Sequence, residues 1–174
     1  MFGFFLDDNV CGLCVLTIPV SFYKLLTLFL FVISQSGTVK VCEIADEVRE
    51  ALKKFRFRKH SNNAALVLKV EREKQLICVE DLHEDISLED LRESLPGHQP
   101  RYVVYSYRMQ HDDGRISFPL CFIYITPRDS QMELQVMYAG SKLALQKEAD
   151  LTRVYEVREL EELTDEWLQE KLSK

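Results

Sequence analysis

The chain has 174 residues, of which 47% are hydrophobic, so it can bury one core of ordinary size and is too short for two large domains. Its 28 acidic and 22 basic residues give a net charge of −6, which argues against broad binding to nucleic acids. Of its five cysteines, three stand singly in apolar or strand-like runs, which indicates buried thiols in a reducing compartment rather than a disulfide framework.

Residues 1–35 differ from the rest of the chain because VCGLCVLTIPVSFYKLLTLFLFVIS is almost wholly apolar. A secretory signal would use LLTLFLFVI as its apolar core, but Asp7 and Asp8 stand where such signals carry positive charge. A membrane anchor needs about 20 apolar residues, and Pro19 and Lys24 interrupt this stretch. The third reading, a translated upstream segment outside the working domain, fits best, and we expect the domain to comprise residues 36–174.

The domain opens with a predicted helix and a predicted β-hairpin. In VCEIADEVREALKKF, residues 41–55, apolar residues recur every three or four positions, which predicts an amphipathic helix. The β-prone runs AALVLKV (64–70) and QLICVED (75–81) flank the charged sequence EREK and predict two paired strands.

FRFRK, residues 55–59, alternates aromatic and basic side chains. A period of two predicts an extended segment with Phe55 and Phe57 on one side and Arg56 and Arg58 on the other. A half-buried segment with a solvated face explains this pattern better than a contact with anionic lipid or another protein.

A short helix and two strands are expected next. SLEDLRESLPG predicts a helix with Ser87 as its N-cap and Pro96-Gly97 as its stop. RYVVYSYRMQ (101–110) and ISFPLCFIYITP (116–127) are dense in β-branched and aromatic residues, so we expect them to pair, with Pro119 at a bulge or facing away from a partner strand.

HDDG separates these two strands and has two interpretations. His111 beside two aspartates suits a metal or acid–base site, which would also need a pocket and a partner group. Asp-Gly between two β runs is a strong hairpin signal, because glycine adopts the positive φ that a tight turn requires. We therefore expect a hairpin tip from which His111, Asp112 and Arg115 project into solvent.

SQMELQVMYAGSKLALQKEAD predicts the longest helix, opened by a capping box between Ser130 and Glu133. One apolar stripe runs along it, and further apolar residues spread around the cylinder, so part of its surface is left to meet a partner. The stripe comprises Met132, Val136, Gly140 and Leu143, and the further residues are Leu134, Met137, Tyr138 and Leu145.

TRVYEVREL predicts one more strand, and TDEWLQEKL predicts a final helix with Thr164 as its N-cap. The complete order predicts an α+β fold in which a central mixed β-sheet is flanked by helices.

No motif in the chain carries a known catalytic mechanism. There is no glycine-rich phosphate loop and no GxSxG, and the four histidines are widely separated in sequence. Cys11 and Cys14 form a lone CxxC, which is a weak metal or redox signal without a second pair. We therefore expect a protein that is not an enzyme and that needs no cofactor and no metal.

Four blocks of the chain, in this order, resemble the glia maturation factors, a branch of the actin-depolymerising-factor homology family: KKFRFRKHSNNAALVLKV, LPGHQPRYVVYSYRMQHDDGRISFPLCFIYITP, VMYAGSKLALQ and LTDEWLQEKL. The resemblance covers about residues 36–174 and implies the actin-depolymerising-factor homology fold. Family members usually start shortly before a segment that matches VKVC, which again places residues 1–35 outside the domain.

The resemblance implies a cytoplasmic regulator of the actin cytoskeleton that binds the actin-related protein 2/3 complex, inhibits branch nucleation and promotes debranching. Actin-severing relatives carry lysines just before the motif matching VMYAGSK, where this chain has Glu133 and Gln135. Losing these cations should weaken docking on acidic actin. We therefore expect weak or no binding to the actin monomer, no binding to nucleic acid, and a monomeric protein.

The resemblance also implies two binding surfaces and a regulatory site. The complex-binding surface would comprise Ser36, Val39, Val41, Gln135, Met137, Gly140, Ser141 and Lys142. The debranching surface would comprise His111, Asp112, Asp113, Arg115, Glu166, Glu170 and Lys171. Ser36 is a candidate phosphorylation site, because added negative charge there would disturb docking.

The alternative hypothesis is a secreted or membrane-tethered growth or differentiation factor, directed by residues 1–35. A membrane contact would arise only through that segment.

Overall fold

The computed structural model describes residues 42–59, 61–111 and 113–173. The chain divides into two units, residues 1–39 and 40–174, and the described residues belong to the second. The predictions made for residues 1–35, including the Cys11 and Cys14 motif, lie outside the described residues.

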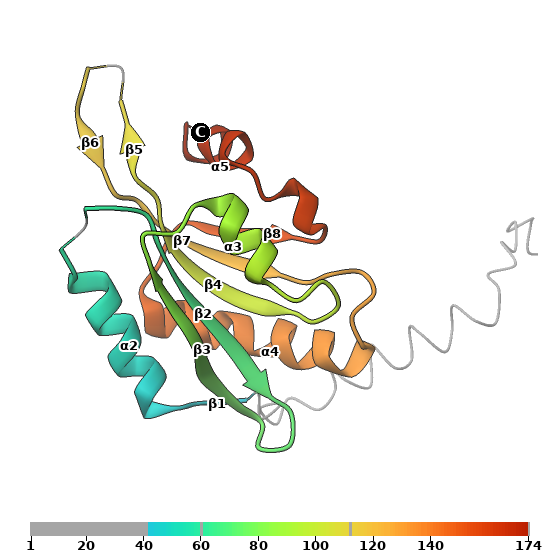
Figure 1. Cartoon of the computed structure of the whole chain (residues 1–174). Coiled ribbons are helices and arrows are strands. Elements are labelled where there is room, and N and C mark those ends of the chain that lie inside the picture. The colour runs from blue at the N-terminus through green and yellow to red at the C-terminus, as the bar shows by residue number, and fades with distance from the viewer. Residues whose placement is uncertain (1–41, 60, 112, 174) are drawn as a thin grey trace, which may run out of the picture. The chain divides into compact units, whose positions relative to one another are not determined.

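A six-stranded mixed sheet forms the centre of the described unit (Figure 1). Antiparallel pairs join the four inner strands, whereas the edge strands β1 and β8 pair in parallel with β3 and β7. The strands in spatial order are β1 (Glu43–Ile44), β3 (Leu76–Glu84), β2 (Ala64–Glu71), β4 (Arg101–Ser106), β7 (Leu120–Ile125) and β8 (Val154–Val157).

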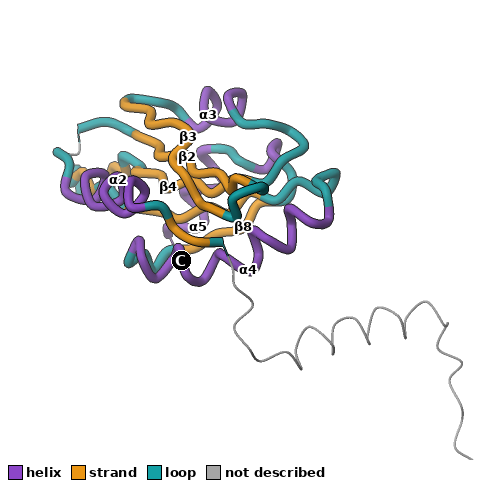
Figure 2. Tube along the Cα trace, turned by 90° about the horizontal axis from the view of Figure 1, so that it is seen from below, coloured by secondary structure: helices purple, strands orange, loops and turns teal. Residues whose placement is uncertain are grey.

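Helices cover both faces of this sheet, as Figure 2 shows with α3 on one side and α2 and α4 on the other. Alternate residues of β4 face opposite ways, so Tyr102 packs under α2 (Asp46–Phe57) and α4 (Met132–Ala149). Val103 packs under α3 (Leu88–Ser94) and α5 (Asp165–Ser173). A 3₁₀ turn, Leu160–Glu162, precedes α5. The layers confirm the predicted α+β fold.

Tyr138 joins α4 to the sheet. Its hydroxyl accepts a hydrogen bond from the Val70 N–H at 2.8 Å, and its carbonyl accepts one from the Tyr102 hydroxyl. The pairing of β2 with β4 ends at Leu68, so Val70 lies beyond that ladder and its N–H is satisfied by the helix instead. The ring also packs 4.9 Å from the ring of Tyr102, centroid to centroid.

The first predicted helix begins later than its apolar spacing suggested. Glu43 and Ile44 pair with Leu76 and Ile77 as strand β1, and helix α2 starts only at Asp46. A two-residue strand is too short to show a period, and its partners lie more than 30 residues away in the sequence.

FRFRK is not extended along its first three residues, because α2 continues to Phe57. Residues two apart lie on opposite sides of a helix, so Phe55 is buried in the core whereas Phe57 is 83% exposed. The Arg58 guanidinium stacks 5.0 Å from the centroid of the Phe55 ring. The prediction that both aromatic rings share one side was therefore wrong.

The capping box predicted for α4 is also absent. The helix begins at Met132, after Gln131, whose side chain makes no capping bond. The Ser130 N–H donates to the carbonyl of Pro127 at 3.1 Å, so Ser130 closes the preceding turn. Glu133 instead pairs with Arg72, with a distance of 3.0 Å between Oε2 and Nη2.

Other local predictions are confirmed. Ser87 Oγ accepts from the Asp90 N–H, and Thr164 Oγ1 accepts from the Trp167 N–H, so both predicted N-caps are present. The three cysteines that the structure describes are free: Cys42 and Cys121 are buried, and Cys78 is half-buried. Burial raises the pKa of the Cys121 thiol to about 12. None of the described helices is long and apolar enough to cross a membrane.

Tyr138→Phe should lower the free energy of unfolding by about 1–3 kcal/mol, because it leaves the buried Val70 N–H without an acceptor while the ring packing is retained. Urea denaturation followed by circular dichroism measures the change. Tyr155→Phe is the matched control, because the Tyr155 hydroxyl donates only a longer, exposed bond of 3.3 Å to Lys171. Equal losses in both variants would contradict the role given to Tyr138.

Candidate functional site

The outer face of α4 exposes a line of apolar side chains. Met132, Val136 and Leu143 are 76%, 63% and 65% exposed, and their spacing of four and seven residues places them on one side of the helix with Gly140. We call Met132, Val136, Gly140 and Leu143 the α4 stripe. The residues buried against the sheet are Tyr138, Ser141, Leu145 and Ala149. The helix is thus apolar on two sides, and such an exposed line is typical of a surface that binds a partner.

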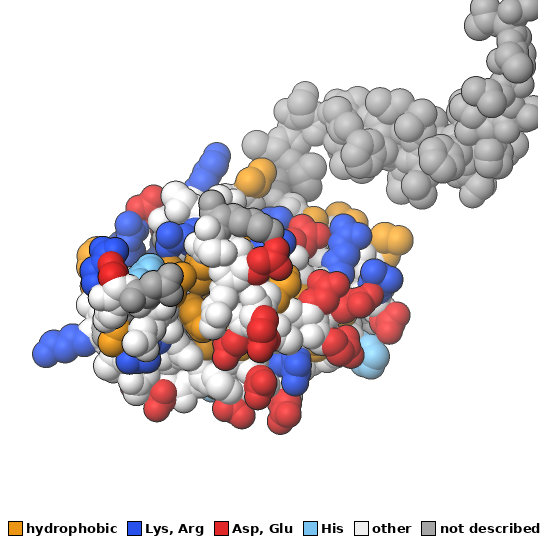
Figure 3. Space-filling model, turned by 90° about the horizontal axis from the view of Figure 1, so that it is seen from above, with side chains coloured by type: hydrophobic (Ala, Val, Ile, Leu, Met, Phe, Trp, Pro, Cys, Tyr) orange, Lys and Arg blue, Asp and Glu red, His pale blue; other side chains and the backbone are white. Residues whose placement is uncertain are grey.

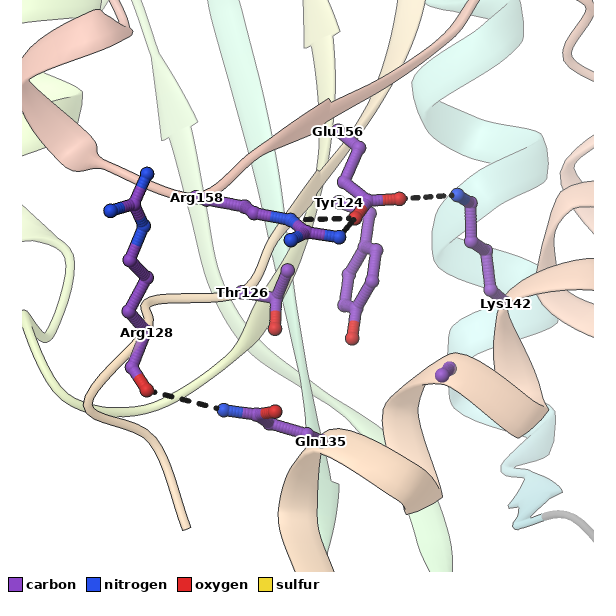
Figure 4. A pocket seen from close by; sticks show the side chains of 8 residues that line it. Tyr124, Thr126, Arg128, Gln135, Lys142, Glu156 and Arg158 are labelled. Atoms are coloured by element: carbon purple, nitrogen blue, oxygen red, sulfur yellow. Dashed lines mark hydrogen bonds and ion pairs between the residues drawn. The ribbon is translucent and has the colours of Figure 1, made fainter. Parts of the chain in front are cut away.

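A cavity of about 480 Å³ lies beside the α4 stripe, between α4 and the strands β7 and β8 (Figure 4). On the polar side of the cavity, the Glu156 carboxylate forms ion pairs with two cations. Its Oε2 lies 3.2 Å from Lys142 Nζ, and its Oε1 lies 3.4 Å from Arg158 Nη2. Lys142 Nζ also lies 5.3 Å from the centroid of the Tyr124 ring. The lining residues are Tyr124, Thr126, Arg128, Gln135, Ala139, Lys142, Glu156 and Arg158. A polar rim next to an apolar line is the usual anatomy of a protein–protein interface.

The α4 residues of the predicted complex-binding surface differ in accessibility. Gln135 and Lys142 line the cavity, and Gly140 is exposed. Met137 is half-buried against the core. Ser141 is fully buried and its Oγ donates to the Met137 carbonyl at 2.8 Å, so it stabilises the helix and does not reach the surface. The remaining members, Ser36, Val39 and Val41, lie outside the described residues.

The cavity also contains residues that the sequence analysis did not identify. Tyr124 of β7 and Glu156 of β8 are direct partners in the parallel pairing of these strands, and their side chains form the wall opposite Lys142. The sequence contains no signal for this pairing, because α4 separates the two strands along the chain.

The predicted hairpin is present as strands β5 (Met109–Gln110) and β6 (Ile116–Ser117). The His111 N–H donates to the Arg115 carbonyl and the Gly114 N–H donates to the His111 carbonyl, each at 2.9 Å. Gly114 has a φ of +82°, the conformation expected of glycine in this turn. We call residues 111–115 the hairpin tip; Asp112 lies outside the described residues.

The side chains of the hairpin tip differ in their exposure to solvent. Arg115 is exposed, and its Nε lies 2.5 Å from Asp113 Oδ2. Hydrogen bonds from the Arg115 N–H and then from its guanidinium hold the pKa of Asp113 below its usual value. His111 does not project as predicted, because it is half-buried and its Nε2 lies 2.8 Å from Ser117 Oγ. No group of three metal-ligating side chains occurs among the described residues.

Helix α5 lies beside the stem of the hairpin (Figure 1). A groove of about 580 Å³ separates them, and the Gln169 Nε2 donates to the Tyr107 hydroxyl at 2.8 Å across it. Its lining residues are Tyr107, Arg108, Met109, Gln110, Glu166, Gln169, Glu170 and Ser173. The structure thus brings Glu166 and Glu170 of the predicted debranching surface next to the stem rather than to the hairpin tip.

Charge is unevenly distributed at this end of the molecule. Seen from the side to which the hairpin and α5 point, acidic side chains gather along the right and lower edges, whereas basic side chains occur at the left, at the top and at the upper right (Figure 3). Lys171 of α5 is exposed, and its Nζ lies 6.0 Å from the centroid of the Trp167 ring. This end therefore offers charges of both signs to a partner.

Comparison with known proteins shows similarity to actin-binding proteins. Residues 41–173 match the family model of cofilin/tropomyosin-type actin-binding proteins. The chain is 64% identical over 133 residues to glia maturation factor of Drosophila melanogaster, which covers 76% of this chain and 96% of that protein. It is 50% identical over 137 residues to human glia maturation factor beta, which covers 79% of this chain and 96% of that protein.

Solved structures show the same similarity in three dimensions. The solution structure of glia maturation factor from Caenorhabditis elegans superposes with a TM-score of 0.67 at 41% identity, covering 78% of this chain and 98% of that one. The crystal structure of Streptomyces griseoflavus cofilin superposes with a TM-score of 0.66 at 20% identity, covering 76% and 97%, which supports the fold alone.

Gly114→Ala should increase the amide exchange rate of His111 about tenfold, because a left-handed conformation costs a non-glycine residue about 1–2 kcal/mol and opens the hairpin locally. Hydrogen exchange followed by NMR measures this rate. Gly97→Ala is the control, because Gly97 has open space around it and no positive φ. An unchanged His111 rate in Gly114→Ala would contradict the turn geometry.

Proposed function

Since this chain belongs to the glia maturation factors of the actin-depolymerising-factor homology family, we propose that it binds the actin-related protein 2/3 complex, inhibits branch nucleation and promotes filament debranching. The observation that carries this proposal is the α4 stripe, which offers an apolar contact on a helix fixed to the sheet. In this proposal the protein is not an enzyme, acts as a monomer, and is located in the cytoplasm at the actin cytoskeleton.

The start of α4 supports a preference for the complex over bare actin. Glu133 is an anion paired with Arg72, so this position contributes no free positive charge. The Gln135 amide is turned back toward the loop before the helix, where its Nε2 donates to the Ser130 carbonyl at 3.0 Å. These are the positions at which the resemblance implies lysines in actin-severing relatives, so the electrostatic attraction to acidic actin is reduced here.

The primary docking surface in this proposal combines the α4 stripe with Gln135, Met137 and Lys142 and with the chain just before the described residues. Ser36, Val39 and Val41 belong to that preceding part. A phosphate on Ser36 would add about 1.5–2 negative charges close to the docking surface and weaken binding there.

The second surface in this proposal consists of the hairpin tip and the outer side of α5, including Glu166, Glu170 and Lys171. It lies on a different part of the molecule, since α5 packs on the sheet face opposite to that of α4. A protein that holds one partner through α4 can therefore present the hairpin tip to another.

The alternative of a secreted or membrane-tethered factor has no support from the relatives or from the described residues.

Val136→Gln with Leu143→Gln should weaken binding to the actin-related protein 2/3 complex at least tenfold, because two apolar side chains of the docking surface are lost while no buried contact changes. Titration of the labelled full-length chain with the complex gives the affinity. Phe57→Gln with Leu82→Gln is the matched control, since these side chains are 83% and 51% exposed and belong to α2 and β3. Equal effects of the two double variants would exclude α4 as the specific docking surface.

Asp112→Ala with Arg115→Ala should leave the helices and strands intact. The free energy of unfolding should stay within about 0.5 kcal/mol of that of the natural chain. The double variant should reduce debranching without an equal loss of affinity, because the hairpin tip lies apart from the α4 stripe. The lifetime of filament branches under a microscope, measured beside the affinity for the isolated complex, separates the two effects. Gly114 is retained so that the turn is not strained.

Proportional losses of affinity and debranching would place the hairpin tip in the primary docking surface and contradict the division into two surfaces. No change in either would show that the side chains of Asp112 and Arg115 are not used for debranching.

A further inference from the structure

Strand β3 has an open edge over most of its length. Of its nine residues, Leu76 and Ile77 pair with β1, and among the described residues no strand pairs with the same edge along residues 79–84. Helix α2 lies beside this edge (Figure 1), and a groove of about 520 Å³ separates the two. We propose that this groove binds an extended peptide of another protein, which joins the sheet as a further strand and carries a lysine or arginine two residues from an apolar side chain.

The backbone groups of residues 79–84 are available to such a strand. Because all residues have the same chirality, strand residues whose side chains share a face also direct their N–H and C=O groups to the same edge. Ile77 packs in the core under α2, and its carbonyl accepts from the Ala45 N–H at 3.1 Å, on the β1 side. Leu82 and Glu84 line the groove together with α2, so their N–H and C=O groups also point to the open edge.

A side chain occupies one of these donors. The Leu82 N–H donates to Asp81 Oδ1 at 2.8 Å, in a bond exposed to solvent. Charged side chains on an edge strand are a usual way in which sheets avoid unselective pairing. A peptide carbonyl can replace the Asp81 carboxylate, because the Leu82 N–H then exchanges one acceptor for another.

The floor of the groove is apolar at its centre. Ala51 and Phe55 of α2 and Leu82 of β3 form it, and Leu82 is 51% exposed. The side chain of the peptide residue opposite Leu82 lies on the same face of the sheet and therefore points toward α2. A valine, isoleucine or leucine at that position buries apolar surface on both sides of the contact.

Two carboxylates beside this floor have no partner. Glu47 and Glu84 are exposed, and within residues 42–59, 61–111 and 113–173 neither forms an ion pair. They lie toward opposite ends of the groove, because Glu47 is in the first turn of α2, near Cys78, whereas Glu84 ends β3. A lysine or arginine two residues before or after the one opposite Leu82 faces the same way and is directed toward one of these carboxylates.

The other charged groups of the groove are already engaged. Lys54 Nζ lies 3.6 Å from Glu50 Oε2. Arg58 stacks on the Phe55 ring, and its Nη2 donates to the Asn62 carbonyl at 2.9 Å. With three carboxylates and two cations among its lining residues, the groove presents negative charge to a ligand, so charge complementarity favours a basic peptide over an acidic one.

A second copy of the chain suits this edge less well than a basic peptide. Pairing two β3 edges would bring Asp81 and Glu84 of one molecule against the same acidic strand of the other, and like charges on facing strands are destabilising. No lysine or arginine among the described residues pairs with either carboxylate. The residues that line the groove belong to neither the α4 stripe nor the hairpin tip, so this binding does not depend on the function proposed above.

The probe for this site is a heptapeptide, blocked at both ends, with valine at its centre, lysine two residues to either side and threonine elsewhere. Its sequence is the same in both directions, so it fits a parallel or an antiparallel strand. NMR titration of the ¹⁵N-labelled full-length chain should show saturable shifts along β3 and α2, with a dissociation constant below about 1 mM.

Amide exchange shows whether the bound peptide forms a strand. With the heptapeptide at about ten times its dissociation constant, exchange of the Leu82 and Glu84 amides should slow about tenfold, because the bound strand accepts from their N–H groups. The Arg115 N–H is the internal control: it also donates to a neighbouring carboxylate, Asp113 Oδ1, at 3.0 Å, but it lies in the hairpin tip. Its exchange should not change.

Variants of the chain separate the two kinds of contact. Leu82→Gln should weaken binding of the heptapeptide about tenfold through the lost apolar contact, and Glu47→Gln with Glu84→Gln should weaken it about fivefold through the lost charges. Val136→Gln with Leu143→Gln, on α4, is the matched control and should leave it unchanged. A heptapeptide with glutamate in place of lysine should bind the natural chain at least about fivefold more weakly, which tests the charge without any change to the fold.

Absence of saturable shifts up to about 5 mM heptapeptide, or saturable shifts confined to elements other than β3 and α2, would overturn the proposal. Saturation with unchanged exchange of the Leu82 and Glu84 amides would overturn it as well, because the peptide would then bind without joining the sheet. Slow exchange of these amides that needs no peptide and increases with protein concentration would assign the edge to a second copy of the chain instead.

Discussion

The position of α4 depends on two hydrogen bonds made by one residue. The hydroxyl of Tyr138 accepts from the Val70 N–H at the end of β2, and its carbonyl accepts from the Tyr102 hydroxyl of β4. Together these bonds set both the height of the helix on the sheet and its rotation. Once Tyr138 faces inward, helical geometry directs Met132, Val136 and Leu143 outward, so the apolar stripe follows from a contact within the core.

The sheet separates the two surfaces on which the proposed function depends. Its strands are buried on both faces, so α2 and α4 cover one core cluster while α3 and α5 cover another. The hairpin of β5 and β6 extends the strands β4 and β7 beyond the sheet, next to α5. Docking through α4 and action through the hairpin tip can therefore occur on the same molecule without competing for the same atoms.

Periodicity predicted the elements well, whereas contacts between distant segments had to come from the structure. The spacing in residues 130–150 predicted the long helix and an apolar surface wider than the core covers, and Asp-Gly predicted the turn at Gly114; that the α4 stripe is the exposed side came from the structure. Strand β1 escaped prediction because two residues show no period, and Ser130 failed as a cap because it closes a turn with Pro127. The cavity wall formed by Tyr124 and Glu156 depends on a pairing between strands that α4 separates in the sequence.

Selection between the actin-related protein 2/3 complex and actin itself is the central claim, and Glu133 and Gln135 are the residues on which it depends. The most direct measurement is cosedimentation of the full-length chain and of its Glu133→Lys, Gln135→Lys variant with bare actin filaments, beside titration of both proteins with the isolated complex. The account predicts that the natural chain binds the complex far more tightly than bare filaments, and that the two lysines increase filament binding about tenfold. Binding of the natural chain to bare filaments as tight as to the complex would contradict it.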